Sequence, residues 1–271
     1  MNNHTWKDPE LATLLSNCLP NTLDTTVWRY PTDDDPTTFV STGDIAAMWL
    51  RDSENQVRPY MRYAKEEPEG IGRLIRGLIK RHVHSVLQDP YANSFSFSVE
   101  DIVCNAGAWL VDNTTKLDET GHRVDGMSIG VHQRKWEMDS LSSTLRLSRK
   151  YYESTGDATP FDAEWRAAVA TIVRTFREQQ KPLTPDNFTQ VNYTFQTQTH
   201  EVKDTTAHGI GRPARWTGMV RTSFLPSDDS ARLPYHVPDN AFAVVELRGA
   251  AKLLKELSGD VSGLCCRVDD F

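Results

Sequence analysis

The sequence predicts an all-α domain whose helices are joined by long polar loops. In several segments apolar residues recur at the spacing of a helix face, and no segment alternates apolar and polar residues up to a hairpin turn. Long polar connections separate the helical segments, at 89–100, 112–136 and 181–236. Because loops longer than about 15 residues are uncommon in compact domains and are usually functional, we expect a helical scaffold with elaborate loops at one end.

Five segments show the strongest helical pattern. They are a segment that begins near Ser53, the segments 68–88, 138–156 and 239–258, and a segment that follows Thr159 and ends before Pro182. Ser53 and Gln56 are three residues apart, as in a capping box at a helix start. Thr159, Pro160 and Asp162 predict an N-cap, a first helical position and an acidic first turn.

Weaker patterns complete the expected fold. Segments 9–17 and 101–111 are weaker helix candidates, and the best strand candidate is 191–202, where apolar and polar residues alternate from Val191 to Phe195. The sequence contains no internal repeat and no low-complexity linker. We therefore expect one domain.

The composition argues against two classes of function. The 271 residues include 30 Lys and Arg against 37 Asp and Glu, which gives a net charge of −7. A nucleic-acid binder needs a basic face to neutralise phosphates, so we expect no nucleic-acid partner. The longest apolar run, Ile45 to Leu50, is far shorter than the ~20 residues that span a bilayer, so we expect no membrane segment.

The cysteines and the N-terminus are less informative. The four cysteines form no Cys-x-x-Cys pair and have no zinc-site spacing, and a disulfide between Cys18 and Cys104 is left open. The first nine residues lack the apolar core of a signal peptide. This is expected of an unprocessed cytosolic protein or of a chain that has lost its leader, so the localisation stays open.

The densest cluster of chemically active residues lies between Ser41 and Ser53, in a turn that enters a helix. It contains Asp44, Trp49, Arg51 and Asp52. Carboxylates and a guanidinium hydrogen-bond the hydroxyls of a sugar, and an indole covers the apolar side of a pyranose ring. This combination indicates a sugar-binding site. The alternative is a buried Arg51–Asp52 ion pair, with Asp52 or Ser53 capping the helix.

A second cluster, Trp136 to Ser140, lies at the start of a helix. Glu137 and Asp139 are two residues apart, so on a helix they point to different sides and we expect at most one of them to face a given pocket. Flanked by Trp136 and Met138, a desolvated carboxyl would keep its proton near neutral pH, as a general acid must. Alternatively, both are first-turn acids that the helix dipole favours.

A third cluster follows further along the chain and includes Asp228, Asp229 and Asn240. The two aspartates could bind sugar hydroxyls, cap a helix or form a turn in a surface loop. Other chemistries have less support, because the sequence has no His-Glu-x-x-His motif, no phosphate-binding loop and no Gly-x-Ser-x-Gly elbow. We expect no metal and no cofactor.

Taken together, four motifs resemble those of glycoside hydrolase family 125, the exo-acting α-1,6-mannosidases, over about residues 19–258. The motifs are Thr42-Gly-Asp-Ile-Ala-Ala-Met-Trp-Leu-Arg-Asp-Ser53, Asp89-Pro-Tyr-Ala-Asn93, Trp136-Glu-Met-Asp-Ser140 and Pro226-Ser-Asp-Asp229. The segment Leu19-Pro-Asn-Thr-Leu-Asp-Thr-Thr26 is similar to the fungal members.

This resemblance implies an (α/α)6 toroid and metal-independent hydrolysis with inversion at the anomeric carbon. The substrate it implies is a mannose-containing oligosaccharide or an N-glycan fragment. Asp139 matches the general acid of the family. The residues that the resemblance points to as substrate-binding are Asp44, Trp49, Arg51, Asp52, Glu137, Asp228, Asp229 and Asn240. We expect Asp44, Arg51, Asp52 and Asp139 to converge on one concave surface.

The sequence also departs from the family pattern. The general base of the family is a Glu near the C-terminus of a longer chain, and we find no matching segment here. We therefore expect 1–258 to be a partial catalytic domain that lacks the base, and 259–271 to be an unrelated tail. Five to seven expected helices are about half of the twelve in a toroid. The alternatives are a non-catalytic mannose-binding remnant and a toroid glycosidase of different sugar specificity.

Overall fold

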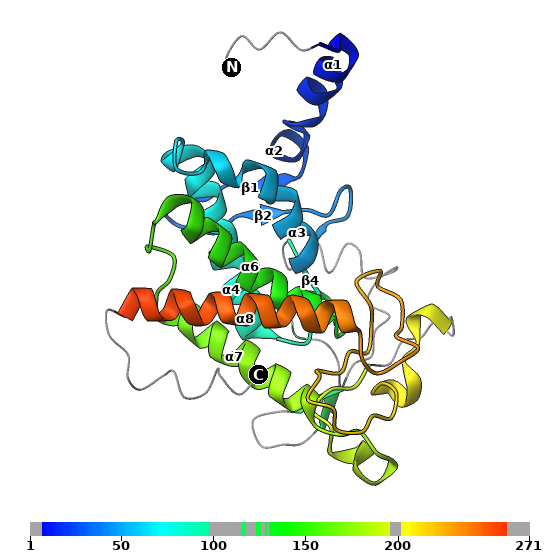
Figure 1. Cartoon of the computed structure of the whole chain (residues 1–271). Coiled ribbons are helices and arrows are strands. Elements are labelled where there is room, and N and C mark those ends of the chain that lie inside the picture. Colours follow the sequence, from blue (N-terminus) through cyan, green and yellow to red (C-terminus); the bar gives the residue numbers. More distant parts are fainter. Residues whose placement is uncertain are drawn as a thin grey trace.

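The computed structural model describes residues 7–97, 115–117, 123–125, 128, 130–195 and 202–258. Helices make up most of this part of the chain, and its strands are only two or three residues long (Figure 1). The all-α prediction is confirmed. None of the helices in the described residues is both long and apolar enough to cross a membrane.

Seven α-helices form the scaffold of the described residues. They are α1 (Pro9–Cys18), α2 (Asn21–Thr25), α3 (Leu50–Val57), α4 (Arg73–Gln88), α6 (Met138–Thr155), α7 (Ala163–Gln180) and α8 (Val237–Ser258). A π-helical turn, Pro68–Gly72, leads into α4, and short 3₁₀ helices occupy Arg58–Tyr63, Pro185–Gln190, Val202–Asp204 and Ala207–Gly209. The helices predicted at 9–17, 68–88, 138–156 and 239–258 are therefore confirmed, whereas the segment 101–111 lies outside the described residues.

Two predicted helix starts are wrong. Helix α7 begins at Ala163, because the side chain of Asp162 accepts a hydrogen bond from the Trp165 amide and caps the helix in place of Thr159. Helix α3 begins at Leu50, so Ser53 lies inside the helix and its hydroxyl donates to the Trp49 carbonyl at 2.8 Å. The predicted end of α6 is confirmed, since Gly156 adopts the left-handed conformation at its C-cap.

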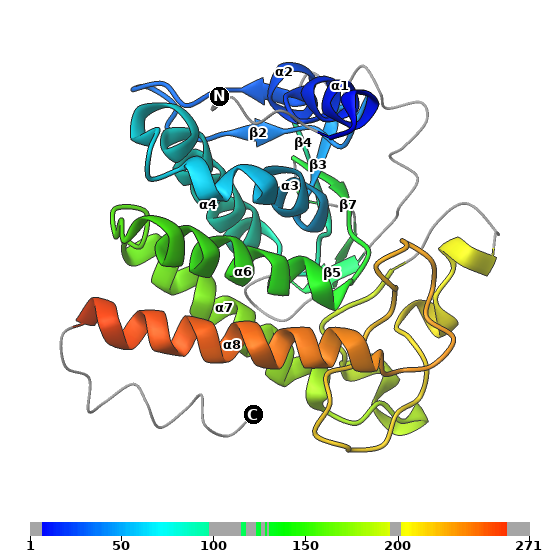
Figure 2. The same cartoon turned by 45° about the horizontal axis from the view of Figure 1, so that its top comes forward.

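Helix α6 is the centre of the packing. It contacts α3, α4 and α8, while α4 also packs on α7, so α6 lies between the other long helices (Figure 2). Its inward face carries Leu141 and Leu145, both essentially inaccessible to solvent. The start of α6 lies at one end of this helical group, and the second sequence cluster, Trp136 to Ser140, runs through it.

A short three-stranded antiparallel sheet lies beside that end. It consists of β3 (Ala47–Trp49), β4 (Ser94–Ser96) and β7 (Val131–Gln133), with Met48 opposite Phe95 and Phe95 opposite Val131. Strand β3 runs directly into α3, and β7 ends shortly before α6 begins. The sheet thus brings the starts of α3 and α6 together.

The remaining strands lie outside this sheet. They are β1 (Val27–Arg29) with β2 (Phe39–Val40), and β5 (Thr115–Leu117) with β6 (Arg123–Asp125). The strand predicted at 191–202 does not appear in the sheets of the described residues: residues 191–195 belong to none of them, and 196–201 lie outside the described residues. Cys18 is exposed at the end of α1, and Cys104 also lies outside the described residues.

Candidate active site

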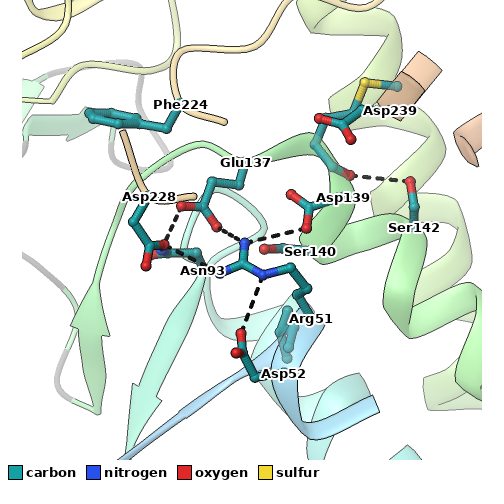
Figure 3. A network of polar contacts seen from close by, with 12 residues as sticks. Arg51, Asp52, Asn93, Glu137, Asp139, Ser140, Ser142, Phe224, Asp228 and Asp239 are labelled. Atoms are coloured by element: carbon teal, nitrogen blue, oxygen red, sulfur yellow. Dashed lines mark hydrogen bonds and ion pairs between the residues drawn. The ribbon is translucent and has the colours of Figure 1, made fainter. Parts of the chain in front are cut away.

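The guanidinium of Arg51 is the centre of a group of four carboxylates (Figure 3). Its Nη1 donates to Glu137 Oε2 at 2.8 Å and lies 3.3 Å from Asp139 Oδ2. Its Nε lies 3.3 Å from Asp52 Oδ2, and its Nη2 lies 3.4 Å from Asp228 Oδ1. The Arg51 side chain is only 16% exposed, so these charges interact where solvent screens them weakly.

Glu137 and Asp139 both reach Arg51, so the prediction that they point to different sides of a helix is wrong. Glu137 is the N-cap of α6 and has an extended backbone, with φ −117° and ψ 116°. Helical spacing therefore does not apply between it and Asp139, which lies in the first helical turn. The change of backbone conformation at the helix start turns the two carboxyls toward the same guanidinium.

The environments of these two carboxyls favour their protonated forms. Burial raises the pKa of Asp139 to about 6; the charge of Arg51 opposes this rise, and the nearby Asp239 carboxylate adds to it. Burial also raises the pKa of Glu137 well above its usual value, helped by a hydrogen bond shared with Asp228. Both side chains are nearly inaccessible to solvent. Burial at the start of α6 thus favours the acid forms of both carboxyls at a higher pH than in a free carboxyl.

Asp228 supplies the opposite charge state. Burial acts to raise the pKa of Asp228. The hydrogen bond with Glu137 and the charges of Arg51 and Lys135 outweigh burial, so this pKa is lowered. Its backbone adopts the left-handed conformation, with φ 63°, which turns its carboxylate toward the cluster. The Lys135 ammonium donates to the Asp228 carbonyl at 2.7 Å and holds this turn in place.

The cation at the centre of the cluster is the guanidinium of Arg51. In the residues that the structure describes, no three histidine, cysteine or acidic side chains are arranged to hold a metal ion. The pKa of Arg51 is raised despite its burial, because the carboxylates around it, first Glu137 and then Asp139, stabilise its positive charge. Arg51 therefore remains charged, and it partly balances the acidic groups that surround it.

Comparison with known proteins identifies the family to which this arrangement belongs. The family model described as metal-independent alpha-mannosidase (GH125) matches residues 8–270. The chain belongs to glycoside hydrolase family 125. It is also 35% identical over 255 residues to the meiotically up-regulated gene 157 protein of Schizosaccharomyces pombe, a match that covers 92% of this chain and 48% of that protein.

A solved family 125 structure supports the same assignment. It is a metal-independent α-mannosidase of Streptococcus pneumoniae in a non-productive complex with α-1,6-mannobiose, 33% identical in sequence with a TM-score of 0.78. The match covers 97% of this chain and 55% of that one, so the chain spans about half the length of both relatives. The helix-rich architecture with few strands matches the (α/α)6 toroid-type fold of this neighbour, as predicted.

Four residues that the family 125 resemblance pointed to lie outside the contacts of Arg51. Trp49 is buried, with its ring edge-to-face against His132 at a centroid distance of 5.4 Å. Asp44 is exposed in a turn, and Asp229 is exposed and accepts a hydrogen bond from Ser227. Asn240 bonds the backbone of Val220, so its side chain anchors a loop to α8. Of the four residues expected to converge on one concave surface, Asp52 and Asp139 both contact Arg51, whereas Asp44 makes none of the contacts described for this cluster.

Sequence reasoning also missed three residues at the site. Asn93 Nδ2 donates to Glu137 Oε1 at 3.1 Å and to Asp228 Oδ1 at 3.3 Å, which links two of the carboxyls. The motif Asp89-Pro-Tyr-Ala-Asn93 could have revealed it. Lys135 and Asp239 have no comparable signal, because Asp239 looks like any acid in a first helical turn and Lys135 becomes relevant only when the 225–229 turn folds against it.

Proposed function

We propose that this family 125 protein removes terminal α-1,6-linked mannose with inversion, and that the present chain supplies its proton donor and part of its mannose-binding site. The observation that carries the proposal is the position of Asp139. Its carboxyl is buried at the start of α6, beside Arg51, with a pKa of about 6. A group with such a pKa is protonated in a useful fraction near neutral pH and donates that proton readily.

The hydrogen bonds around the two acids favour Asp139 over Glu137 as the donor. Glu137 is fully engaged, because one oxygen accepts from Arg51, the other from Asn93, and the carboxyl shares a hydrogen bond with Asp228. In contrast, Asp139 Oδ1 has no hydrogen-bond partner among the described residues. A free oxygen on a protonated carboxyl is what a departing glycosidic oxygen requires.

The neighbouring groups would then hold the sugar. Arg51, Asp52 and Asp228 present charged donors and acceptors from two different segments, as recognition of vicinal hydroxyls requires. We propose Glu137 as a further polar contact. Binding roles for Trp49, Asp44, Asp229 and Asn240 stay predictions from the family resemblance. The mannobiose bound by the Streptococcus pneumoniae relative supports α-1,6-mannosides as the substrate class.

Inversion requires a second carboxylate about 6.5–9.5 Å from the acid, which activates water on the opposite face of the sugar. We assign this role to none of the described residues. The family resemblance implies that a Glu near the C-terminus of a longer chain has this role, on a segment for which we find no match in this sequence. The proposal for this chain therefore concerns proton donation and mannose binding.

The test compares two substrates that differ in their need for a proton. We would measure cleavage of α-1,6-mannobiose and of 2,4-dinitrophenyl α-mannoside by the chain and by its Asp139→Asn variant, with sodium azide as an external nucleophile that needs no general base. If Asp139 is the general acid, mannobiose cleavage falls at least about 100-fold, because proton donation contributes that much. Cleavage of the dinitrophenyl mannoside falls far less, since this leaving group departs without protonation. Asp186→Asn, an exposed acid in a 3₁₀ helix, is the matched control.

Other outcomes would contradict the proposal. Equal losses on both substrates would show that Asp139 does not act as an acid. Binding of mannobiose without turnover of either substrate would favour a non-catalytic mannose-binding chain. Faster cleavage of another disaccharide, such as isomaltose, would favour a toroid glycosidase of different specificity. Proton NMR of the product tests inversion, because the mannosyl azide must form as the β anomer.

A further inference from the structure

A buried chain of hydrogen bonds joins three helices behind the Arg51 cluster. His82 on α4 lies between Ser53 on α3 and Thr144 on α6, with 2.8 Å between its Nε2 and Ser53 Oγ and 3.1 Å between its Nδ1 and Thr144 Oγ1. The three side chains are at most 3% exposed. The mechanism proposed above does not use any of them.

The Trp49 carbonyl, at one end of this series of hydrogen bonds, determines the direction of each bond. Ser53 Oγ lies 2.8 Å from the Trp49 carbonyl, so its single proton goes there. Ser53 must then accept from His82 Nε2–H, which leaves His82 Nδ1 as an acceptor for the Thr144 hydroxyl. A neutral imidazole offers one donor and one acceptor, and burial lowers the pKa of His82 to about 3, so the ring is neutral.

Both ends of this series of hydrogen bonds lie next to the proposed catalytic residues. The Trp49 carbonyl immediately precedes α3, two residues before Arg51. Thr144 lies five residues after Asp139 on the same helix, and its hydroxyl is 3.4 Å from the Ser140 carbonyl. The helices that carry the guanidinium and the proton donor are thus tied together through one imidazole.

We propose that His82 is a positioning residue, which fixes the separation of the Arg51 guanidinium and the Asp139 carboxyl by holding α3 and α6 in register. The inference rests on the proposed function of Asp139 as the proton donor. A second polar link between α3 and α6 lies further along α6 from Asp139, where Arg146 pairs with the buried Glu54 and donates to Asn55 Oδ1 at 3.1 Å. Two more polar contacts tie α6 to other helices. Trp165 Nε1 donates to Ser148 Oγ at 3.0 Å, and Arg149 pairs with Glu246. A polar link with fixed directions sets a separation more closely than apolar packing does, because each bond has its own length and angle.

The test measures the pKa of Asp139 directly, by ¹³C NMR titration of the full chain labelled at aspartate carboxyls, with Asp139→Asn for assignment. Two variants break the chain of hydrogen bonds: His82→Leu, and the nearly isosteric Thr144→Val, which preserves the packing. His82→Gln keeps an amide donor for Ser53 and is the conservative rescue. Ser148→Ala is the matched control, since it removes a buried hydroxyl from the same helix one turn further from the site.

We expect both breaking variants to raise the pKa of Asp139 by at least about half a unit, because a more distant Arg51 stabilises the carboxylate less. The Gln variant should restore most of the wild-type value, and the Ser148 variant should leave it unchanged. An unchanged or lowered pKa in both breaking variants, or an equal rise in Ser148→Ala, would overturn the proposal. Because this titration needs no turnover, a failure of the proposed function would appear separately, in the two-substrate assay.

Discussion

The two sides of the Arg51 cluster are built in different ways. Arg51, Glu137 and Asp139 lie at the starts of α3 and α6, with side-chain exposures of 16%, 0% and 5%. On the other side, Asp228 is 37% exposed and belongs to a turn closed by a hydrogen bond from the Leu225 amide to the Asp229 carbonyl. The helical side fixes buried charges whose pKa values burial controls, whereas the turn contributes a carboxylate whose position depends on a local backbone conformation.

The largest expected effect comes from removing the cation that the two sides share. The Arg51→Met variant leaves its carboxylates without their counter-charge, so we expect a loss of about 3–5 kcal/mol in the free energy of unfolding at pH 8. The loss should be smaller at pH 5, because the carboxyls, with their pKa values raised further, are then protonated. Urea unfolding at the two pH values measures it. An equal loss at both would show that packing, and not charge, makes Arg51 important.

A second prediction concerns the helical side alone. The folded-state pKa of Asp139 is about 6, above its usual value of 3.8, so the folded chain binds more protons than the unfolded chain between these values. Stability therefore falls as the pH rises from about 4 to about 6, by on the order of 3 kcal/mol for this group. The Asp139→Asn variant has no group that titrates here. Between pH 4 and pH 8 its free energy of unfolding should therefore rise by that amount relative to the wild type. Urea unfolding of both proteins checks the difference, and parallel curves would contradict it.

A third prediction concerns the turn. Asp228 has φ 63°, a conformation that costs an alanine roughly 1 kcal/mol and a glycine nothing. Both Asp228→Ala and Asp228→Gly remove the carboxylate, so the difference between them reports the backbone alone. We expect the glycine variant to be the more stable of the two by roughly 1 kcal/mol in thermal unfolding. The reverse order would mean that the turn relaxes when the carboxylate is lost.

The smallest effect is expected one residue further on. Asp229 is exposed, and its carboxylate accepts a hydrogen bond from Ser227 only two residues away. The Asp229→Ala variant should therefore change the free energy of unfolding by no more than about 0.5 kcal/mol. Urea unfolding of the Asp229→Ala and Asp228→Ala variants in parallel compares the two residues. A loss of unfolding free energy in Asp229→Ala as large as that in Asp228→Ala would contradict the prediction.

Local periodicity predicted the helices well, because their apolar faces and caps are encoded in adjacent residues. The C-cap at Gly156 and the course of α4 follow from such short-range signals. The start of α3 was missed because its N-cap, Trp49, is the last residue of a strand and carries no capping side chain. The three-stranded sheet was missed as well, since strands of three residues are too short for an alternating pattern.

The sequence predicted which residues form the site better than it predicted how they are arranged. The clusters around Arg51 and Asp139 indicated sugar chemistry, and the structure brings them together. However, the approach of Glu137 to the same guanidinium depends on the extended backbone of one N-cap residue, which spacing along a helix does not represent. The contacts of Asn93 and Lys135 depend on pairings between distant segments, so no local window could contain them.

The long sequence separations within the Arg51 cluster also affect how the protein acquires its charge balance during synthesis. Arg51 leaves the ribosome 86 residues before Glu137 and 177 residues before Asp228, so it stays hydrated for most of translation. Contacts between such distant residues form late, because a large loop must close first. The contact with Asp228 cannot form before residue 228 has been synthesised, and until then the partners of Arg51 are limited to the carboxylates of α3 and of the start of α6.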